Sequence, residues 1–221
     1  AAGVLFLSEP YKDEFIEKHV MNKFKSSIRD KSSVIRNGLE SFWLENKNQV
    51  KTIEDSKTIN ILCVGKIDEN KNIITTINAL DILKSEGYQV SFTVVGQVMD
   101  QKVQKEITQS DYTNVIDYLP KEELIKIYRK NDVYVMPSIH ESFGRVYAEA
   151  MTQGLPVIYS KGQGFDGIYP DGFVGYSVPS RNPEYISECI KKVIKNYSVI
   201  SANCINECDD FDWKRITNQL E

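Results

Sequence analysis

From residue 59 onward, short apolar runs alternate with segments whose apolar residues recur at helical spacing. The apolar runs are rich in β-branched and aromatic residues and lack strict alternation, which is typical of strands buried on both faces. They occupy residues 59–64, 90–95, 114–119, 132–136, 156–159 and 174–178. Strands that alternate with helices pair in parallel through right-handed crossovers. The sequence therefore predicts an α/β fold with a doubly wound parallel sheet.

Helices are expected between these strands. In residues 72–86 the apolar side chains fall on one stripe, and Gly87 is placed to end the helix. A second helix is expected after Pro120, and a third after Asn182, which is a good N-cap residue before Pro183 at the first helical position. The expected buried side of the third helix consists of Tyr185, Ile186, Cys189, Ile190, Val193 and Ile194.

The first 50 residues follow a different pattern. A strand, a helix and a second strand are expected at residues 4–7, 11–24 and 33–35, in that order. Residues 45–58 are polar and charged, as in a linker, and the whole segment has too little apolar surface for a core of its own. We expect residues 1–50 to be the tail of an N-terminal domain with an interdomain linker, and residues 51–221 to form the main domain.

Composition argues against several classes of protein. The chain has 221 residues, 41% hydrophobic and 26% charged, which suffices for a core without disulfides or a structural metal. A net charge of −4 argues against nonspecific nucleic-acid binding. The sequence lacks a run of 18 apolar residues, so we expect a cytoplasmic protein with at most peripheral membrane contact. Cys63, Cys189, Cys204 and Cys208 are expected to be reduced thiols, and we expect neither a metal site nor a cofactor.

Glycines and cations follow the predicted strands. Gly65 and Lys66 come directly after the first strand, with Lys71 shortly beyond, and Gly96 comes after the second. Taken singly, these are ordinary strand-ending turns and surface lysines. Ligands of open parallel sheets bind beyond the carboxyl ends of the strands, where all these residues meet. Together they predict a site for a negatively charged ligand such as a diphosphate.

The connection after the fourth strand is the most informative. Residues 142–144 lead into a helix expected to run to about Gln153, and a helix N-terminus favours phosphate binding. Glu141 lies before this helix and Glu149 inside it, so the two carboxylates can flank a diphosphate and bind a hydroxylated group at each end. Two alternatives stay open: Glu149 on a solvated helix face, and Glu141 as a simple acid at a helix start.

Residues 137–151 read Pro-Ser-Ile-His-Glu-Ser-Phe-Gly-Arg-Val-Tyr-Ala-Glu-Ala-Met, and Gly-Leu-Pro-Val-Ile follows at 154–158. This segment resembles the Glu-x7-Glu signature of the group 1, family 4 retaining glycosyltransferases. The glutamate spacing alone is a weak signal, but in this context it is highly specific. The resemblance covers about residues 59–220 and reaches back to residues 1–40. It implies the GT-B fold, in which two Rossmann-like domains face each other across a cleft.

The resemblance also implies residue roles. Glu149 would bind the ribose of a nucleotide, Glu141 the donor sugar, and the backbone at residues 142–144 the diphosphate. Lys71 would neutralise the departing phosphate with Lys66, which stands where the family usually has arginine and so lacks the bidentate fork. The candidate catalytic residues are Lys66, Lys71 and Glu141, and the candidate donor-binding residues are Gly65, Gly96, Leu119, Ser142, Phe143, Gly144 and Glu149, with Leu119 in the loop that meets the base.

Two departures from the family pattern stand out. Asn72 replaces the glycine usual after the family lysine, and residues 162–167 replace a Gly-Gly-x-x-Glu segment in a way similar to enzymes of capsule and cell-surface polysaccharide synthesis. The second departure leaves open whether Asp166 contacts the donor sugar. The resemblance implies a UDP- or GDP-sugar donor and a saccharide or lipid-linked acceptor held mainly by an N-terminal domain. We therefore expect this chain alone to bind donor weakly and to turn over little.

Three other functions compete with this interpretation. A sugar-nucleotide epimerase of the same fold would share the diphosphate site but needs acid–base residues that the sequence does not supply. For the transfer reaction itself, His140 is tempting as an acid or base, but a loop or packing histidine is the more common case. A non-catalytic nucleotide-binding domain is the second alternative, against which Glu141, Glu149 and Lys71 argue. A receiver-like signalling domain would need acidic residues after the first strand, where Gly-Lys stands instead.

Overall fold

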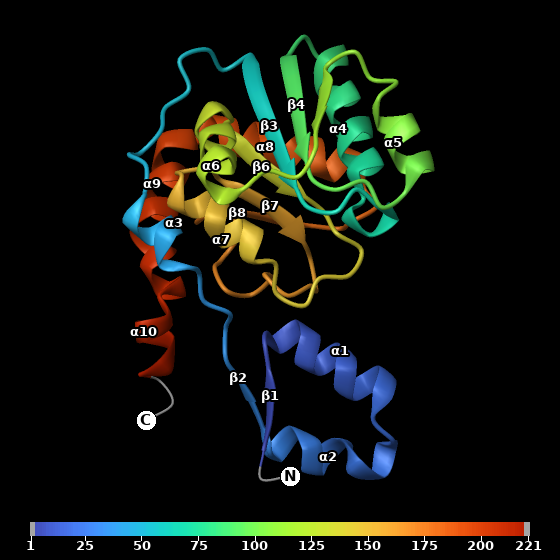
Figure 1. The fold of residues 1–221 in the computed structure, drawn as a ribbon. Coiled ribbons are helices and arrows are strands. Elements are labelled where there is room, and N and C mark those ends of the chain that lie inside the picture. Colours follow the sequence, from blue (N-terminus) through green and yellow to red (C-terminus); the bar gives the residue numbers. More distant parts are fainter. Residues whose placement is uncertain (1–2, 219–221) are drawn as a thin grey trace.

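The computed structural model describes residues 3–218 and contains two units of unequal size (Figure 1). The larger unit is built on a six-stranded parallel sheet in the order β5-β4-β3-β6-β7-β8. Its strands are β3 (Thr58–Val64), β4 (Gln89–Val95), β5 (Thr113–Ile116), β6 (Val133–Met136), β7 (Val157–Ser160) and β8 (Gly175–Val178). The order reverses beside β3, as in a doubly wound fold. The predicted α/β class and parallel sheet are confirmed.

Helices cover both faces of this sheet. The connecting helices are α4 (Ile73–Ser85), α5 (Gln101–Ile107), α6 (Lys121–Lys130) and α7 (Arg145–Thr152). The chain closes with α8 (Pro183–Lys195), α9 (Tyr197–Glu207), the 3-10 turn η2 (Cys208–Phe211) and α10 (Trp213–Thr217). Helix α4 packs against α5 and α8 on one face, whereas α7 packs against α9 and the short helix α3 (Ser41–Glu45). None of the helices within residues 3–218 is long and apolar enough to cross a membrane.

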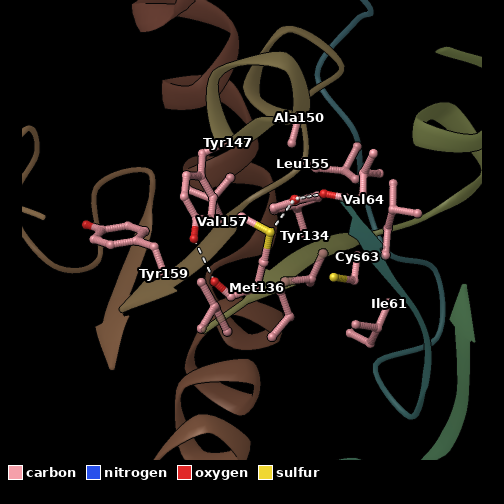
Figure 2. Close-up of a cluster of buried hydrophobic side chains, with 14 of the residues drawn as sticks. Ile61, Cys63, Val64, Tyr134, Met136, Tyr147, Ala150, Leu155, Val157 and Tyr159 are labelled. Carbon is pink, nitrogen blue, oxygen red and sulfur yellow. Dashed lines mark hydrogen bonds between the residues drawn. The ribbon is translucent and has the colours of Figure 1, made fainter. Parts of the chain in front are cut away.

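The centre of the sheet is mostly apolar, and tyrosine hydroxyls are among its few buried polar groups. All residues of β6 and β7 are buried, which explains why these strands show no alternation in sequence. The Tyr134 hydroxyl donates to the carbonyl of Val64 at 3.0 Å, and that of Tyr147 donates to Met136 at 2.6 Å (Figure 2). These bonds fix α7 and the end of β3 to the end of β6. The carboxyl edge of the sheet is therefore rigid where the site was predicted.

Asn72 adopts a backbone conformation that glycine also favours. It is the one non-glycine residue in the described part of the chain with a left-handed backbone, at φ 52°. Asparagine tolerates this region better than other side chains. Its side-chain amide also donates to the carbonyls of Pro137 and Ser180. The replacement of glycine by asparagine thus keeps the turn between η1 (Glu69–Lys71) and α4.

The smaller unit consists of a two-stranded parallel sheet and two helices. Strand β1 (Val4–Phe6) pairs with β2 (Ser32–Val34), and α1 (Glu9–His19) and α2 (Asn22–Asp30) connect them. The single helix predicted at residues 11–24 is wrong. The chain becomes extended at Val20, whose backbone N–H still closes the last turn on Ile16, and a new helix starts two residues later. Helix α1 also begins earlier than predicted because Ser8 caps it.

Residues 39–51 pack against the larger unit. Leu39 and Trp43 are buried in its core, and the backbone N–H of Leu39 donates to the carbonyl of Phe211 at 2.8 Å. Further along, Asn48 donates to Thr152 at 2.9 Å, and residues 46–57 contain neither helix nor strand. The polar segment predicted as a linker is thus an extended strap on the surface of the larger unit.

Three further details differ from the expectations. Strand β5 ends at Ile116, so the predicted strand at 114–119 overran by three residues into the loop that carries Leu119. Tyr185 was expected on the buried side of α8, but it lies in the first turn of that helix and is 39% exposed. Helix α5 was not predicted, and it starts where Asp100 accepts from the backbone of Val103.

Candidate functional site

Two adjoining pockets lie at the carboxyl edge of the sheet. The first, here called the edge pocket, has a volume of about 460 Å³ and lies between the ends of β3 and β4, the residues after β5, and α7. The second, called the loop pocket, has a volume of about 240 Å³ and lies over the connection from β6 to α7. Both pockets include Gly65 and Glu149 in their walls, so they form one continuous depression.

The structure brings all ten predicted site residues to these two pockets. The edge pocket contains Gly65, Lys66, Gly96, Leu119 and Glu149. The loop pocket contains Gly65, Lys71, Glu141, Ser142, Phe143, Gly144 and Glu149. These residues come from five separate segments between residues 65 and 149, and they meet because parallel strands present their carboxyl ends at one edge. Their individual roles stay predictions.

The glycines after β3 and β4 keep the floor of the edge pocket open. Gly96 has φ 154°, and a Cβ atom there would lie 1.9 Å from the carbonyl oxygen of Gly65. Backbone hydrogen bonds also hold each glycine to the neighbouring strand. The N–H of Gly65 donates to the carbonyl of Val95 at 2.9 Å, and the N–H of Gly96 donates to that of Ile116 at 3.0 Å. No side chain fits at Gly96, so backbone lines this part of the pocket.

The connection from β6 to α7 is held from behind by the loop after β7. The backbone N–H of Glu141 donates to the side-chain oxygen of Gln163 at 2.8 Å, and Gly164 donates to the carbonyl of Glu141 at 2.8 Å. A Cβ atom at Gly164 would lie 2.3 Å from the backbone of Ser142. The glycine-rich variant segment at 162–167 therefore packs backbone against backbone and fixes the position of Glu141.

Gly144 sets the direction of α7. It has φ 80°, and a Cβ atom there would lie 2.4 Å from the ring of Tyr147. No side chain of the described residues caps this helix, so its first turn faces the loop pocket without a capping group. The helix lies where the sequence predicted it, with Glu141 before its start and Glu149 inside it. Only the part from Arg145 onward is helical, and residues 141–144 form a loop.

Lys71 and Glu141 form an ion pair in the loop pocket. The Lys71 Nζ atom lies 2.7 Å from Glu141 Oε2, and the two side chains are only 17% and 14% exposed. Lys71 is positioned by its own backbone N–H, which donates to Asp68 at 3.1 Å. The predicted phosphate-binding cation and the predicted sugar-binding carboxylate are therefore direct partners. A diphosphate that binds Lys71 competes with this carboxylate.

Glu149 faces inward toward the edge pocket. The hydroxyl of Tyr128 donates to its Oε2 atom at 3.3 Å. Burial raises the pKa of Glu149 to about 7, although the positive charge of Arg145 and the bond from Tyr128 act in the opposite direction. The alternative of a solvated helix face is therefore wrong for this residue. A hydrogen-bond donor close to this carboxyl group would favour its ionised form.

Several residues that line the depression were not among the predicted site residues, and some of them carry charge or a large aromatic ring. Arg145 contributes to both pockets, and Glu40, Trp43 and Lys121 contribute to the edge pocket. Lys121 Nζ lies 2.5 Å from Glu40 and closes the rim between α6 and the strap. Arg145 was detectable, because it precedes Glu149 by one helical turn and must share its face. Glu40 and Trp43 were not, because they belong to the segment predicted to lie outside the main domain.

Two tempting residues lie elsewhere. His140 contributes to neither pocket; its side chain is 69% exposed, with Nδ1 3.9 Å from Glu14. The carboxylate of Asp166 accepts from the backbone of Gly162 at 2.7 Å and so stabilises its own turn. Within residues 3–218, His, Cys, Asp and Glu side chains form no group of three that could hold a metal ion. The four cysteines are buried free thiols.

Comparison with known proteins agrees with this geometry. Residues 45–208 match the family model "Glycosyl transferases group 1". A capsular polysaccharide biosynthesis glycosyltransferase, CapM of Staphylococcus aureus, is 27% identical over 209 residues, which are 90% of this chain and 54% of CapM. The chain thus spans about half the length of this curated relative.

Solved structures share the fold over the whole chain. Anabaena Alr3699/HepE in complex with UDP and glucose superposes with a TM-score of 0.78 at 20% identity, covering 100% of this chain and 62% of that one. The sucrose-phosphate synthase of Thermosynechococcus elongatus superposes with a TM-score of 0.76 at 20% identity, covering 100% and 57%. The family model matches most of the chain, and the larger unit is a Rossmann-like domain of the GT-B type. The chain therefore belongs to the group 1 glycosyltransferases.

Proposed function

We propose that this chain is the donor-binding part of an enzyme that transfers a sugar from a nucleoside diphosphate to an acceptor with retention of anomeric configuration. Residues 51–221 bind the donor, and residues 1–50 are the end of the preceding domain and the linker. The observation that carries this proposal is the meeting of Lys71, Glu141, the start of α7 and Glu149 in one depression.

The donor spans both pockets. The base lies in the edge pocket against the backbone at Leu119, and Glu149 accepts hydrogen bonds from the ribose hydroxyls. The diphosphate lies in the loop pocket over the backbone of Ser142, Phe143 and Gly144, where the α7 dipole favours negative charge. The buried ring of Phe143 anchors this backbone in the core. The sugar lies beyond, at Glu141.

The chain stabilises charge on the leaving group. The bond between the anomeric carbon and the diphosphate oxygen breaks, and its electron pair goes to the diphosphate. The acceptor oxygen forms the new bond on the same face, and its proton passes to an oxygen of the leaving diphosphate. Lys71, Lys66 and the first turn of α7 are fixed positive groups beside the departing oxygens, and such preorganised charge is a large source of rate acceleration. Glu141 loses its partner Lys71 to the phosphate and accepts hydrogen bonds from the sugar hydroxyls instead.

The relatives support a uridine nucleotide and a cell-surface product. The HepE structures are described in complex with UDP and with UDP-glucose, and CapM is described as a capsular polysaccharide enzyme. We therefore place UDP-sugars ahead of GDP-sugars. The saccharide or lipid-linked acceptor is held mainly by the preceding domain. We place the transfer reaction in the cytoplasm or at the inner face of the membrane. Because the preceding domain holds the acceptor, we expect the chain alone to turn over little substrate.

Calorimetric titration with UDP and GDP tests the proposal. UDP is expected to bind, and Glu149→Gln is expected to weaken binding at least about tenfold, because a charge-assisted hydrogen bond contributes about 1.5–3 kcal/mol. Glu188→Gln is the matched control, since Glu188 is a distant and exposed carboxylate on α8. Absence of nucleotide binding, or equal affinities of Glu149→Gln and the wild type, would contradict the donor site.

A further inference from the structure

Two consecutive residues after β3 hold two consecutive residues after β6. The side-chain amide of Asn70 donates to the carbonyl of His140 at 3.0 Å and accepts from the backbone N–H of His140 at 2.9 Å. Lys71 comes next in the chain, and it pairs with Glu141, which follows His140. The backbone carbonyl of Asn70 also accepts from the N–H of Ile139 at 2.8 Å. The turn η1 is therefore attached to the connection from β6 to α7 at three successive residues.

Asn72 fastens the start of the same connection. Its side-chain amide donates to the carbonyl of Pro137, directly after β6, and to that of Ser180, in the loop after β8. Its side-chain oxygen accepts from the hydroxyl of Thr75 at 2.6 Å, which orients the amide. A glycine at this position would keep the left-handed turn but lose all three bonds. We call the side chains of Asn70 and Asn72 the asparagine clamp.

The connection that carries Glu141 is held from both sides. Asn70 binds the N–H and the carbonyl of His140 on one side. On the other side, Gln163 and Gly164 bind the N–H and the carbonyl of Glu141. These main-chain groups are thus used within the protein, so they fix the loop rather than bind a ligand. What Glu141 offers to a donor is its carboxylate.

The position of Asn70 indicates a local role. Its side chain is half-buried and water competes for its hydrogen bonds, so they contribute little to global stability. An ion pair between long side chains forms against their conformational entropy, which favours the pair only where the two backbones are held at a fixed spacing. Asn70 supplies this spacing, because it joins the two residues that directly precede Lys71 and Glu141.

We propose that Asn70 is a positioning residue of the donor site, which holds the carboxylate of Glu141 against the ammonium of Lys71 through the backbone of His140. The proposal deepens the proposed function and rests on it, because the pair concerns a donor only if the loop pocket holds the diphosphate. In the free site, the clamp keeps the carboxylate on the cation that the phosphate takes. When phosphate binds Lys71, the backbone of Glu141 stays in place and only its side chain turns toward the sugar.

The NMR signal of the Lys71 ammonium tests the geometric step in the 221-residue chain without any ligand. An ammonium that a carboxylate holds exchanges its protons slowly with water, so it gives a proton–nitrogen correlation peak at mildly acidic pH and low temperature. Lys71→Met identifies the peak by removing it. Asn70→Ala should weaken or abolish the peak. Asn78→Ala is the matched control, since Asn78 is an exposed asparagine on the following helix α4.

Calorimetric titration with UDP tests the functional step through a double-mutant cycle. Asn70→Ala frees Lys71 for the phosphate, so UDP affinity should rise about two- to fourfold. In the Glu141→Gln background the competing carboxylate is gone, so the same substitution should change UDP affinity by less than about 1.5-fold. A purely structural role of Asn70 predicts another pattern, in which affinity falls by the same factor in both backgrounds.

A second variant and a folding control complete the experiment. Asn72→Gly keeps the turn and loses the anchors after β6 and β8, so it should weaken the ammonium peak less than Asn70→Ala does. Urea unfolding should give a midpoint for Asn70→Ala close to that of the wild type. An unchanged Lys71 peak in Asn70→Ala, or equal changes of UDP affinity in both backgrounds, would overturn the positioning role and leave the donor site standing. If the wild type does not bind UDP, the proposed function fails, and the Lys71 peak alone decides whether Asn70 holds the pair.

Discussion

Glu149 shows how much of a single residue's environment can be predicted from the sequence. The motif pointed to it, but a helix position alone did not distinguish a solvated carboxylate from a buried ligand. Its partial burial behind Tyr128 excludes a fully solvated carboxylate, and it raises the pKa of Glu149 to about 7 from a reference value of 4.5. Burial of this kind depends on α6 and α7 packing together. The burial of Glu149 is therefore a property of the tertiary fold, and the spacing of residues in the sequence does not predict it.

This pKa predicts a stability change with pH. A carboxyl whose folded pKa is raised stabilises the fold when protonated, so its contribution is complete below about pH 4.5 and is lost as pH rises through about 7. The loss is up to about 3 kcal/mol. Glu149→Gln is always neutral, so it should match wild type at pH 5 and be more stable at pH 8. Urea unfolding at both pH values measures this, and Glu188→Gln should show no such gain. Parallel pH profiles of Glu149→Gln and wild type would contradict the assignment.

The Lys71–Glu141 pair predicts opposite effects on nucleotide binding and on transfer. Glu141→Gln removes the competitor of the phosphate for Lys71, so UDP affinity should rise several-fold, by about 1 kcal/mol. Lys71→Met should lower UDP affinity at least about tenfold. Titration calorimetry gives both values. In the two-domain enzyme that we propose, Glu141→Gln should nevertheless slow sugar transfer. Weaker UDP binding by Glu141→Gln would show that this carboxylate does not compete with the phosphate.

At the scale of elements, periodicity found most of the larger unit. The strands of the sheet and helices α4, α6 and α8 were located from apolar spacing because they are buried in regular ways. The failures occur where the local signal is weak or tertiary contacts decide. The break between α1 and α2 has neither glycine nor proline to announce it. Helix α5 has only seven residues, so its stripe is too short to stand out.

Helix α7 and its glycine start support a prediction at this scale. Gly144→Ala should cost about 1–2 kcal/mol for the left-handed backbone and more for the clash with Tyr147, whose ring is buried and held by Met136. UDP binding should fall at least about tenfold, because the first turn of α7 moves. Chemical denaturation and calorimetry measure the two effects.

Gly162→Ala is the matched control for backbone strain. Gly162 has φ 73°, close to that of Gly144, but a Cβ atom there meets no atom within 4 Å. It should therefore show the strain of about 1 kcal/mol without the clash and without loss of UDP binding. Equal losses in the two variants would mean that the left-handed backbone, and not the contact with Tyr147, limits the site.

At the scale of the molecule, the rule that ligands bind at the carboxyl edge located the depression before any coordinates. It brought together residues from Gly65 to Glu149 because parallel strands all end on one side. It did not reveal that Lys71 pairs with Glu141 or that Glu40 and Trp43 complete the edge pocket. The first contact depends on side-chain rotamers, and the second on how the segment between the two units packs. Both are set by tertiary packing.

The last prediction concerns how the two units depend on each other. Within residues 3–36, the buried side chains are those of Phe6, Ser8 and Ile16, whereas Leu39 and Trp43 belong to the core of the larger unit. Removing residues 1–36 should therefore leave stability within about 1 kcal/mol and UDP affinity within a few-fold of the whole chain. Removing residues 1–50 should cost at least about 3 kcal/mol, because it strips Trp43 from the ring of Tyr128.

Denaturant unfolding and titration with UDP distinguish these truncations. The fragment that starts at residue 37 keeps every predicted donor residue, so it should bind UDP. If removal of residues 1–36 instead unfolds the larger unit, the two units unfold as one cooperative body. The hydrogen bond from Ser8 to Ser142 would then belong to a larger stabilising interface than the buried residues indicate. Donor binding that survives in this fragment would show that the donor half folds and works without the segment that we assign to its partner domain.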